Sequence, residues 1–208
     1  MLTEFTINLD EWLDNLSTLY PVGVYFVIFL IIFMETAFFP IAPVLPGDGL
    51  LFLIGILAAS GSLSFWMAAI TAILGGIIGN IVAYEMGIYL SPKHGTKIRW
   101  LKHKRFTTAN NFYNKYGIKA LFYSRFIPII RSVVPLVAGI AFMNHKTFVK
   151  YSILSVALWV FLIMTAAYFL GQIDWVKRHF TAIVLIFTLV STLPMFIMWI
   201  KIKLLQLK

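Results

Sequence analysis

YGIKALFYSRFIPIIRSVVPLVAGIAFM, residues 116–143, is the segment that decides the fold of this chain. It is apolar enough to enter a lipid bilayer, yet it contains two arginines, Arg125 and Arg131. Pro128 and Pro135 prevent one straight helix, because proline lacks a backbone donor and clashes with the preceding turn. A charged side chain at membrane depth costs at least about 2.5 kcal/mol. Two arginines on a broken apolar segment therefore indicate a protein-lined cavity that receives an anion.

The composition of the whole chain is strongly apolar. Of 208 residues, 61% are hydrophobic and only 12% are charged, which is typical of an integral membrane protein. The chain has no cysteine, which excludes a disulfide framework and a thiolate metal site. The four histidines lack the spacing of metal ligands, and hydrolase and nucleotide-binding motifs are absent. We therefore expect no enzyme activity, no metal and no cofactor.

Charge is divided sharply along the chain. Residues 1–92 contain no lysine or arginine and seven of the eight acids, whereas all 17 basic residues follow position 92. Basic loops of membrane proteins stay in the cytoplasm, where they contact anionic lipid headgroups. The pattern predicts that residues 93–115 and both termini are cytoplasmic. Because the basic residues flank apolar spans, nucleic-acid binding is not expected.

Apolar runs and proline positions predict an all-α polytopic membrane protein with about four transmembrane helices and two re-entrant helical hairpins. Residues 21–200 form a single membrane domain. The expected segments are an interfacial amphipathic helix at 1–20, spans at 21–39, 64–90, 151–171 and 180–200, hairpins at 40–61 and 116–143, a basic segment at 93–115 and a tail at 201–208. The hairpins are shaped by Pro40, Pro43, Pro46, Gly47, Pro128, Pro135 and Gly139. They enter from opposite faces, an inverted-repeat-like arrangement that in secondary transporters places the substrate near the midplane.

The string Arg125, Pro128, Arg131, Pro135 and Gly139 resembles the DedA family of bacterial membrane proteins, also described by a SNARE-associated or VTT domain. Two further stretches agree. They are Glu35 with the segment Phe39–Asp48, and Gly75–Asn80 with Tyr84 and Gly87. The resemblance covers roughly residues 25–170 and implies a cytoplasmic-membrane lipid transporter, with proton coupling proposed for some members. Many members have an aspartate where this chain has Asn80, and Glu85 is the nearby acid.

Arg125 and Arg131 are the expected phosphate-binding residues, because a guanidinium offers a planar fork that binds two phosphate oxygens. On an unbroken helix they would point apart, whereas a break at Pro128 would let them converge. The alternatives are an ion pair with Glu35, Asp48 or Glu85, or snorkelling to the interface.

Glu35 and Asp48 are the expected proton-coupling or gating acids. A carboxylate in the cavity would compete with substrate phosphate for an arginine and could bind and release a proton. The alternative for Asp48 is a helix cap, and for Glu35 an interfacial position. Asn80, Tyr84 and Glu85 are accessory candidates, although Glu85 could instead reach the cytoplasmic surface.

The residues and the resemblance together predict a flippase that moves a phosphate-bearing lipid across the membrane, and the resemblance implies undecaprenyl phosphate as first choice and proton coupling. A phospholipid scramblase or phosphatidylethanolamine flippase, a proton-coupled small-ion antiporter and a non-transporting assembly factor stay open. The sequence does not rank polyprenyl phosphate against phospholipid, because both present the same phosphate. Expected partners are the lipid, protons and anionic lipids at residues 93–115, and a homodimer is a further possibility.

Overall fold

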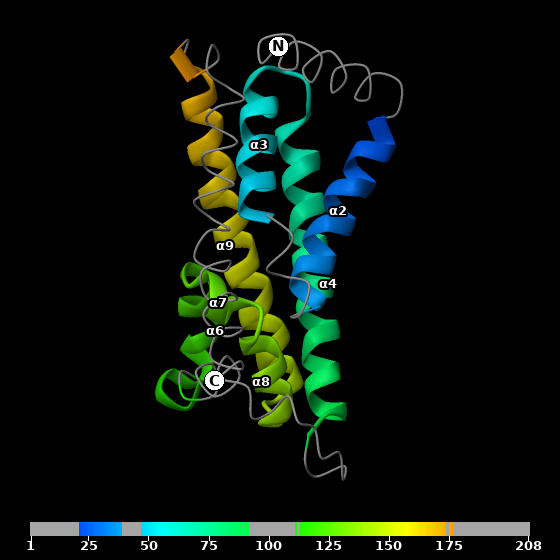
Figure 1. Cartoon of the computed structure of the whole chain (residues 1–208), viewed down its shortest axis with the longest axis vertical. Helices are drawn as coiled ribbons and strands as arrows, with labels where there is room; N and C mark the ends of the chain where they lie inside the picture. The colour runs from blue at the N-terminus through cyan, green and yellow to red at the C-terminus, as the bar shows by residue number, and fades with distance from the viewer. Residues whose placement is uncertain (1–20, 39–46, 92–110, 112, 174, 177–208) are drawn as a thin grey trace, which may run out of the picture.

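The computed structural model describes residues 21–38, 47–91, 111, 113–173 and 175–176. Within these ranges every regular element is a helix. The elements are α2 (Pro21–Ala37), α3 (Gly47–Ala59), α4 (Phe65–Tyr89), η3 (Gly117–Lys119), α6 (Ala120–Tyr123), η4 (Ser124–Phe126), α7 (Pro128–Arg131), α8 (Val134–Ile140) and α9 (His145–Gly171). The structure is an elongated bundle in which α4 and α9 run beside α2 and α3 at one end and beside α6, α7 and α8 at the other (Figure 1). The chain is thus all-helical, as predicted, over the described part.

The two longest helices, α4 and α9, are long and apolar enough to cross a membrane. They have 25 and 27 residues, about 38 and 40 Å at 1.5 Å per residue, against a hydrocarbon core of about 30 Å. Helix α4 lies within the predicted span 64–90, whereas α9 begins six residues before the predicted start at 151. The reason is Asn144, whose side chain accepts a hydrogen bond from the Thr147 backbone N–H and so caps the helix.

The segment around the two arginines is a series of short helices. Ile127 has an extended backbone (φ −120°, ψ 101°), and Pro128 follows at the start of α7. A residue before proline is pushed away from helical geometry, which explains this break. A second break separates α7 from α8, whose first turn contains Pro135. The number of spans and the depth of both hairpins stay predictions, and segments 1–20, 180–200 and 201–208, with nearly all of 93–115, lie outside the described residues.

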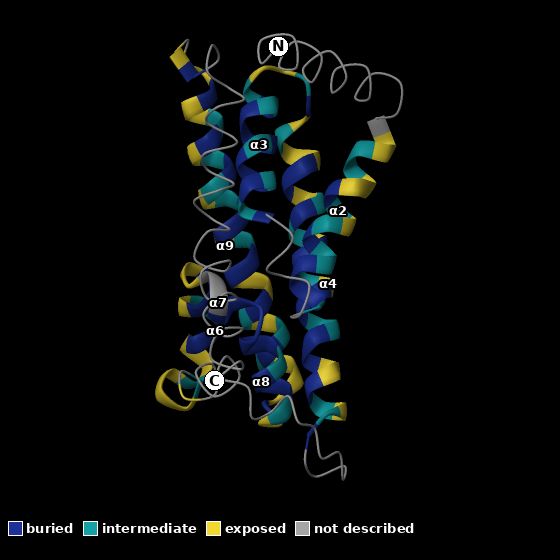
Figure 2. Ribbon diagram, viewed as in Figure 1, coloured by how far each residue is buried: buried dark blue, intermediate teal, exposed yellow. Residues whose placement is uncertain are grey.

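Close packing holds helix α8 against α4. Gly87 of α4 and Gly139 of α8 meet so closely that a Cβ on Gly139 would overlap the carbonyl oxygen of Tyr84. Only glycine allows two helix backbones to approach in this way. Tyr84 packs beside this contact in a buried cluster that includes Val134, Val137 and Phe148. Figure 2 shows buried residues, in dark blue, along α3, α4, α8 and α9.

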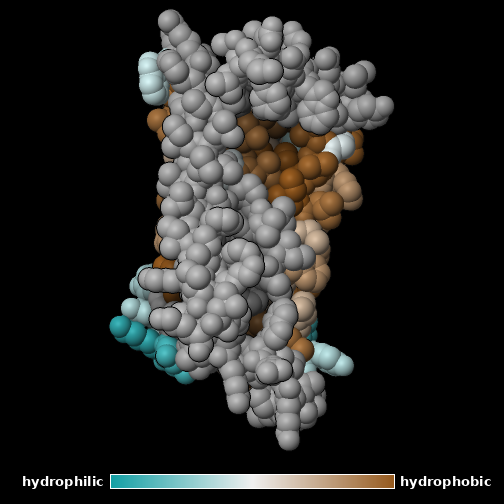
Figure 3. Space-filling model, viewed as in Figure 1, coloured by the Kyte–Doolittle hydropathy of each residue, from teal (hydrophilic) through white to brown (hydrophobic). Residues whose placement is uncertain are grey.

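The outward surface of the long helices is apolar. Figure 3 shows brown, hydrophobic surface on the side where α2 and α4 lie. The large hydrophobic side chains exposed on these two helices are Val22, Phe26, Val27, Leu30, Trp66, Met67, Ile70, Leu74, Ile78, Met86 and Tyr89. A soluble monomer rarely exposes so continuous an apolar face, whereas lipid would cover it.

Candidate functional site

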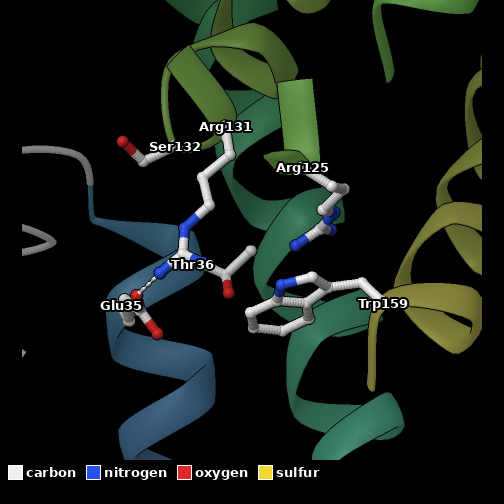
Figure 4. Close-up of a pocket in the computed structure, with 6 residues that line it drawn as sticks. All are labelled: Glu35, Thr36, Arg125, Arg131, Ser132 and Trp159. Carbon is white, nitrogen blue, oxygen red and sulfur yellow. Dashed lines mark hydrogen bonds and ion pairs between the residues drawn. The ribbon is translucent and has the colours of Figure 1, made fainter. Parts of the chain in front are cut away.

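A small cavity lies where α2, α7 and α9 meet. It is lined by Glu35, Thr36, Arg125, Arg131, Ser132 and Trp159 (Figure 4). Its volume of about 10 Å³ is roughly the space for one water molecule. Trp159 lies fourteen residues after the start of α9 and twelve before its end, so the cavity is near the middle of this long helix. Arg125 and Arg131, the arginines predicted to bind phosphate, therefore lie at membrane depth if α9 spans the bilayer.

Arg131 is held by two carboxylates. Its Nη2 donates to Oε1 of Glu35, and its Nη1 donates to Oδ1 of Asp48 at 2.5 Å. Glu35 and Arg131 are 4% and 9% exposed, so both charges of the first pair are removed from solvent. A planar guanidinium fork suits this arrangement because its two nitrogens point at two acceptors at once. Asp48 lies in the first turn of α3 and uses its carboxylate for this ion pair.

Arg125 is arranged differently, although it is also buried, at 7% exposure. Within the described part of the chain, its Nη2 has no hydrogen-bond partner. Its guanidinium carbon lies 5.4 Å from the ring centroid of Trp159, and that of Arg131 lies 5.0 Å from the same ring. Figure 4 shows Arg131 extending to Glu35, whereas Arg125 extends toward Trp159. The break before Pro128 thus brings the two arginines into one cavity.

Gly47 fits tightly against Glu35. A Cβ on Gly47 would overlap Oε2 of Glu35, so glycine at the start of α3 allows the carboxylate to lie where it reaches Arg131. Sequence reasoning assigned Gly47 to shaping the hairpin, and the structure adds this contact with the acid. The neighbouring Pro40, Pro43 and Pro46 lie outside the described residues.

Replacing Gly47 by alanine should therefore displace the Glu35 carboxylate and weaken its bond to Arg131. We expect the free energy of unfolding to fall by about 1.5–3 kcal/mol, the contribution of one buried hydrogen bond to a charged group. Gly55→Ala is the matched control, because its Cβ would meet Met164 and Ala167 of α9, away from the acids. Both variants should lower thermal stability. A thermal stability of Gly47→Ala equal to that of the native chain would contradict the role of the Gly47 contact.

The three accessory candidates do not line the cavity. The Asn80 side chain donates to Oγ of Ser152 at 2.6 Å, and the Tyr84 hydroxyl donates to the carbonyl of Met143. Glu85 lies 3.3 Å from Nε2 of His145, with both side chains about half exposed. Sequence reasoning had offered these residues for the site, and the structure instead places them at the contacts of α4 with α9 and with the turn after α8.

Sequence reasoning did not single out three residues of the cavity, Thr36, Ser132 and Trp159. The first two carry hydroxyls but no charge, so nothing in the sequence distinguishes them from other small polar residues. Trp159 did offer a signal. Tryptophan usually marks the membrane interface, whereas Trp159 lies in the centre of the predicted span 151–171. A tryptophan at that depth needs another reason to be there.

Over the described residues, the chain is a helical bundle with two helices apolar enough to cross a membrane and a buried arginine–carboxylate site. Known proteins resemble it closely. The model of the VTT domain matches residues 45–169. The chain is 33% identical to Protein DedA of Escherichia coli K12 over 197 residues, 93% of this chain and 90% of that protein. It is 34% identical to inner membrane protein YqjA of the same strain over 151 residues, 71% of this chain and 68% of the relative.

The chain therefore belongs to the DedA family of membrane proteins. An uncharacterized membrane protein of Mycobacterium leprae, ML0287, is also similar, at 32% identity over 169 residues, 79% of this chain and 74% of that protein. No solved structure matches the chain. The VTT match covers Asp48, both arginines and Trp159 but begins ten residues after Glu35.

Proposed function

We propose that this chain moves a phosphate-bearing lipid between the leaflets of the bacterial cytoplasmic membrane, with undecaprenyl phosphate as the foremost substrate. The observation that carries the proposal is the convergence of two buried guanidiniums, Arg125 and Arg131, on one cavity near the middle of α9. Buried ionisable groups at membrane depth are costly, and in membrane proteins they mark substrate and ion pathways. A lipid tail could remain in the bilayer while its phosphate enters the protein.

The size and charge of the cavity suggest how such a phosphate would be handled. A cavity of about 10 Å³ accepts roughly one water, so a phosphate must displace the carboxylates from Arg131 or separate the helices. Two arginines and two carboxylates balance in charge. An entering phosphate adds at least one negative charge, which uptake of a proton by Glu35 or Asp48 would offset. Competition for Arg131 would thereby couple lipid movement to protons.

Arg125 favours a transporter over a purely structural assembly factor. An assembly factor would be expected to neutralise both arginines with internal acids, whereas of these two arginines only Arg131 forms ion pairs with acids among the described residues. Nη2 of Arg125 keeps a free donor, which a substrate anion would satisfy.

Transport by purified protein in vesicles tests the proposal. Vesicles containing labelled undecaprenyl phosphate, phosphatidylglycerol or phosphatidylethanolamine would be compared with and without an imposed pH gradient. We expect the polyprenyl phosphate to move fastest, with a dependence on the gradient, and Arg125→Gln protein to be inactive. Equal movement of all three lipids, unchanged in Arg125→Gln, would support a non-selective scramblase. No movement of any lipid above protein-free vesicles would reject lipid transport.

The proposed orientation places both termini and the basic segment 93–115 in the cytoplasm, because positive loops are translocated reluctantly. Since the chain has no cysteine, a single cysteine can be introduced at position 97 or 104 without further changes. We expect an impermeant thiol reagent to label neither position in intact cells and both after lysis. Labelling from outside in intact cells would refute this orientation.

A further inference from the structure

The two arginines of the cavity are not equally available. Arg131 already donates to Glu35 and Asp48, so both ends of its fork are occupied. An incoming anion can use this guanidinium only after breaking a buried ion pair, which is an expensive step. Arg131 in this conformation is therefore closed to substrate.

Arg125 is open in the same conformation. Its side chain lines the cavity, its Nη2 is enclosed by protein, and among the described residues nothing accepts the proton of that nitrogen. Buried donors without a partner are rare in folded proteins and need an explanation. The cavity holds only about one water, so the helices must separate to admit a phosphate, but a phosphate that reaches Arg125 would supply the missing acceptor without first breaking an ion pair.

Trp159 explains why Arg125 stays open. Both guanidiniums lie within about 5.5 Å of its ring centroid, the range in which a cation is attracted to an indole face. The ring is itself fixed, because Trp159 is 5% exposed and belongs to the buried cluster with Val156 and Val160. Without the ring, Arg125 would be free to turn toward Glu35 or Asp48, whose charges attract it. That movement would give Nη2 of Arg125 an acceptor within the protein and leave it unavailable to an incoming anion.

We propose that the two arginines act in sequence, that Arg125 receives the phosphate first, and that Trp159 is the positioning residue that keeps Arg125 open. This inference rests on the proposed phosphate-lipid function and adds an order of events to it. Phosphate bound at Arg125 is then beside Arg131, where it competes with the two carboxylates. Release of Arg131 from Glu35 and Asp48 is the second step, and it is the step that commits the lipid to crossing.

Binding of a short soluble probe separates the first step from transport. Farnesyl phosphate would be titrated into the purified full-length chain in detergent by thermophoresis, with farnesol as the uncharged control. Arg125→Lys and Arg131→Lys form a matched pair, since each keeps its charge and loses the fork. We expect Arg125→Lys to weaken binding by about tenfold or more, and Arg131→Lys to bind within about threefold of the native chain yet lose lipid transport.

Variants of Trp159 test the positioning role. Trp159→Leu should weaken probe binding by about tenfold, whereas Trp159→Phe, which keeps an aromatic face, should bind within about threefold of the native chain. Trp66→Leu makes the same change on the exposed face of α4 and should bind normally. Rescue by phenylalanine distinguishes attraction to a ring from filling of space. If Trp159→Leu loses folded protein, the two lysine variants still decide the order in which the arginines act.

Three results would overturn the inference. They are native binding by Trp159→Leu, equal loss in both lysine variants, and a greater loss in Arg131→Lys. In each case farnesyl phosphate still binds the native chain, so the proposed function stands and only the order of events falls. If the native chain binds farnesyl phosphate no better than farnesol, phosphate recognition itself fails, and both the function and its order are rejected.

Discussion

Replacing Arg131 by glutamine should destabilise the folded protein by about 3–5 kcal/mol, the cost of leaving one side of a buried ion pair without its partner. The reason is local. Glu35 and Asp48 both direct an oxygen at Arg131, and the Glu35 carboxylate is almost completely enclosed. Thermal unfolding in detergent, followed by the loss of monodisperse protein on gel filtration, would measure this effect. Arg125→Gln is the matched control, because no described acid loses an ion-pair partner in that variant, and its stability should change less.

A second substitution distinguishes a role of Arg131 in stability from a role in phosphate binding. Arg131→Gln combined with Asp48→Asn should express and withstand heating better than Arg131→Gln alone, since one unpaired carboxylate has been removed. We expect the double variant to remain unable to move undecaprenyl phosphate, because the guanidinium that receives phosphate in the second step is still missing. Recovery of transport in the double variant would mean that the ion pair is structural and that phosphate binds elsewhere.

Much of the fold could be predicted from the sequence because proline and charge constrain a membrane chain strongly. Helix α4 follows from one long apolar run, and the break before α7 follows from Pro128. Helix α9 starts earlier than predicted, and the prediction is late because Lys146 and Lys150 look like a basic surface patch. Asn144, a favoured N-cap residue, was the available signal for that start.

The partners within the site could not be predicted, because sequence spacing does not determine side-chain contacts between separate helices. Glu35, Asp48 and Glu85 were equal candidates for pairing with arginine. The structure divides them, since the first two reach Arg131 and Glu85 pairs with exposed His145. Asn80 is on α4 next to Gly79, which packs against Thr36 of the cavity, yet its amide turns to Ser152 on α9. The hydrogen-bond partner of a buried side chain depends on which neighbouring helix lies beside it, and only the packed structure shows this.

The acids should control the response of transport to a pH gradient. In Glu35→Gln or Asp48→Asn, an amide replaces the carboxylate at nearly the same size and can still accept a hydrogen bond from Arg131. The remaining acid keeps one ion pair, so both variants should fold. Each variant leaves two arginines and one carboxylate at the cavity, a net charge of one positive. Protonation of Glu35 or Asp48 in the native chain would produce the same net charge.

Phosphate should accordingly bind these two variants more tightly than the native chain, by about tenfold for one fewer competing charge. Lipid movement should persist but no longer respond to an imposed pH gradient, because no proton needs to be taken up when phosphate enters. Glu85→Gln is the control, since it makes the same change at an exposed acid outside the cavity and should keep the native response. The measurement is the rate of lipid movement in vesicles at several imposed gradients. If both acid variants respond to the gradient as the native chain does, Glu35 and Asp48 serve only to hold Arg131, and the driving proton binds at another place.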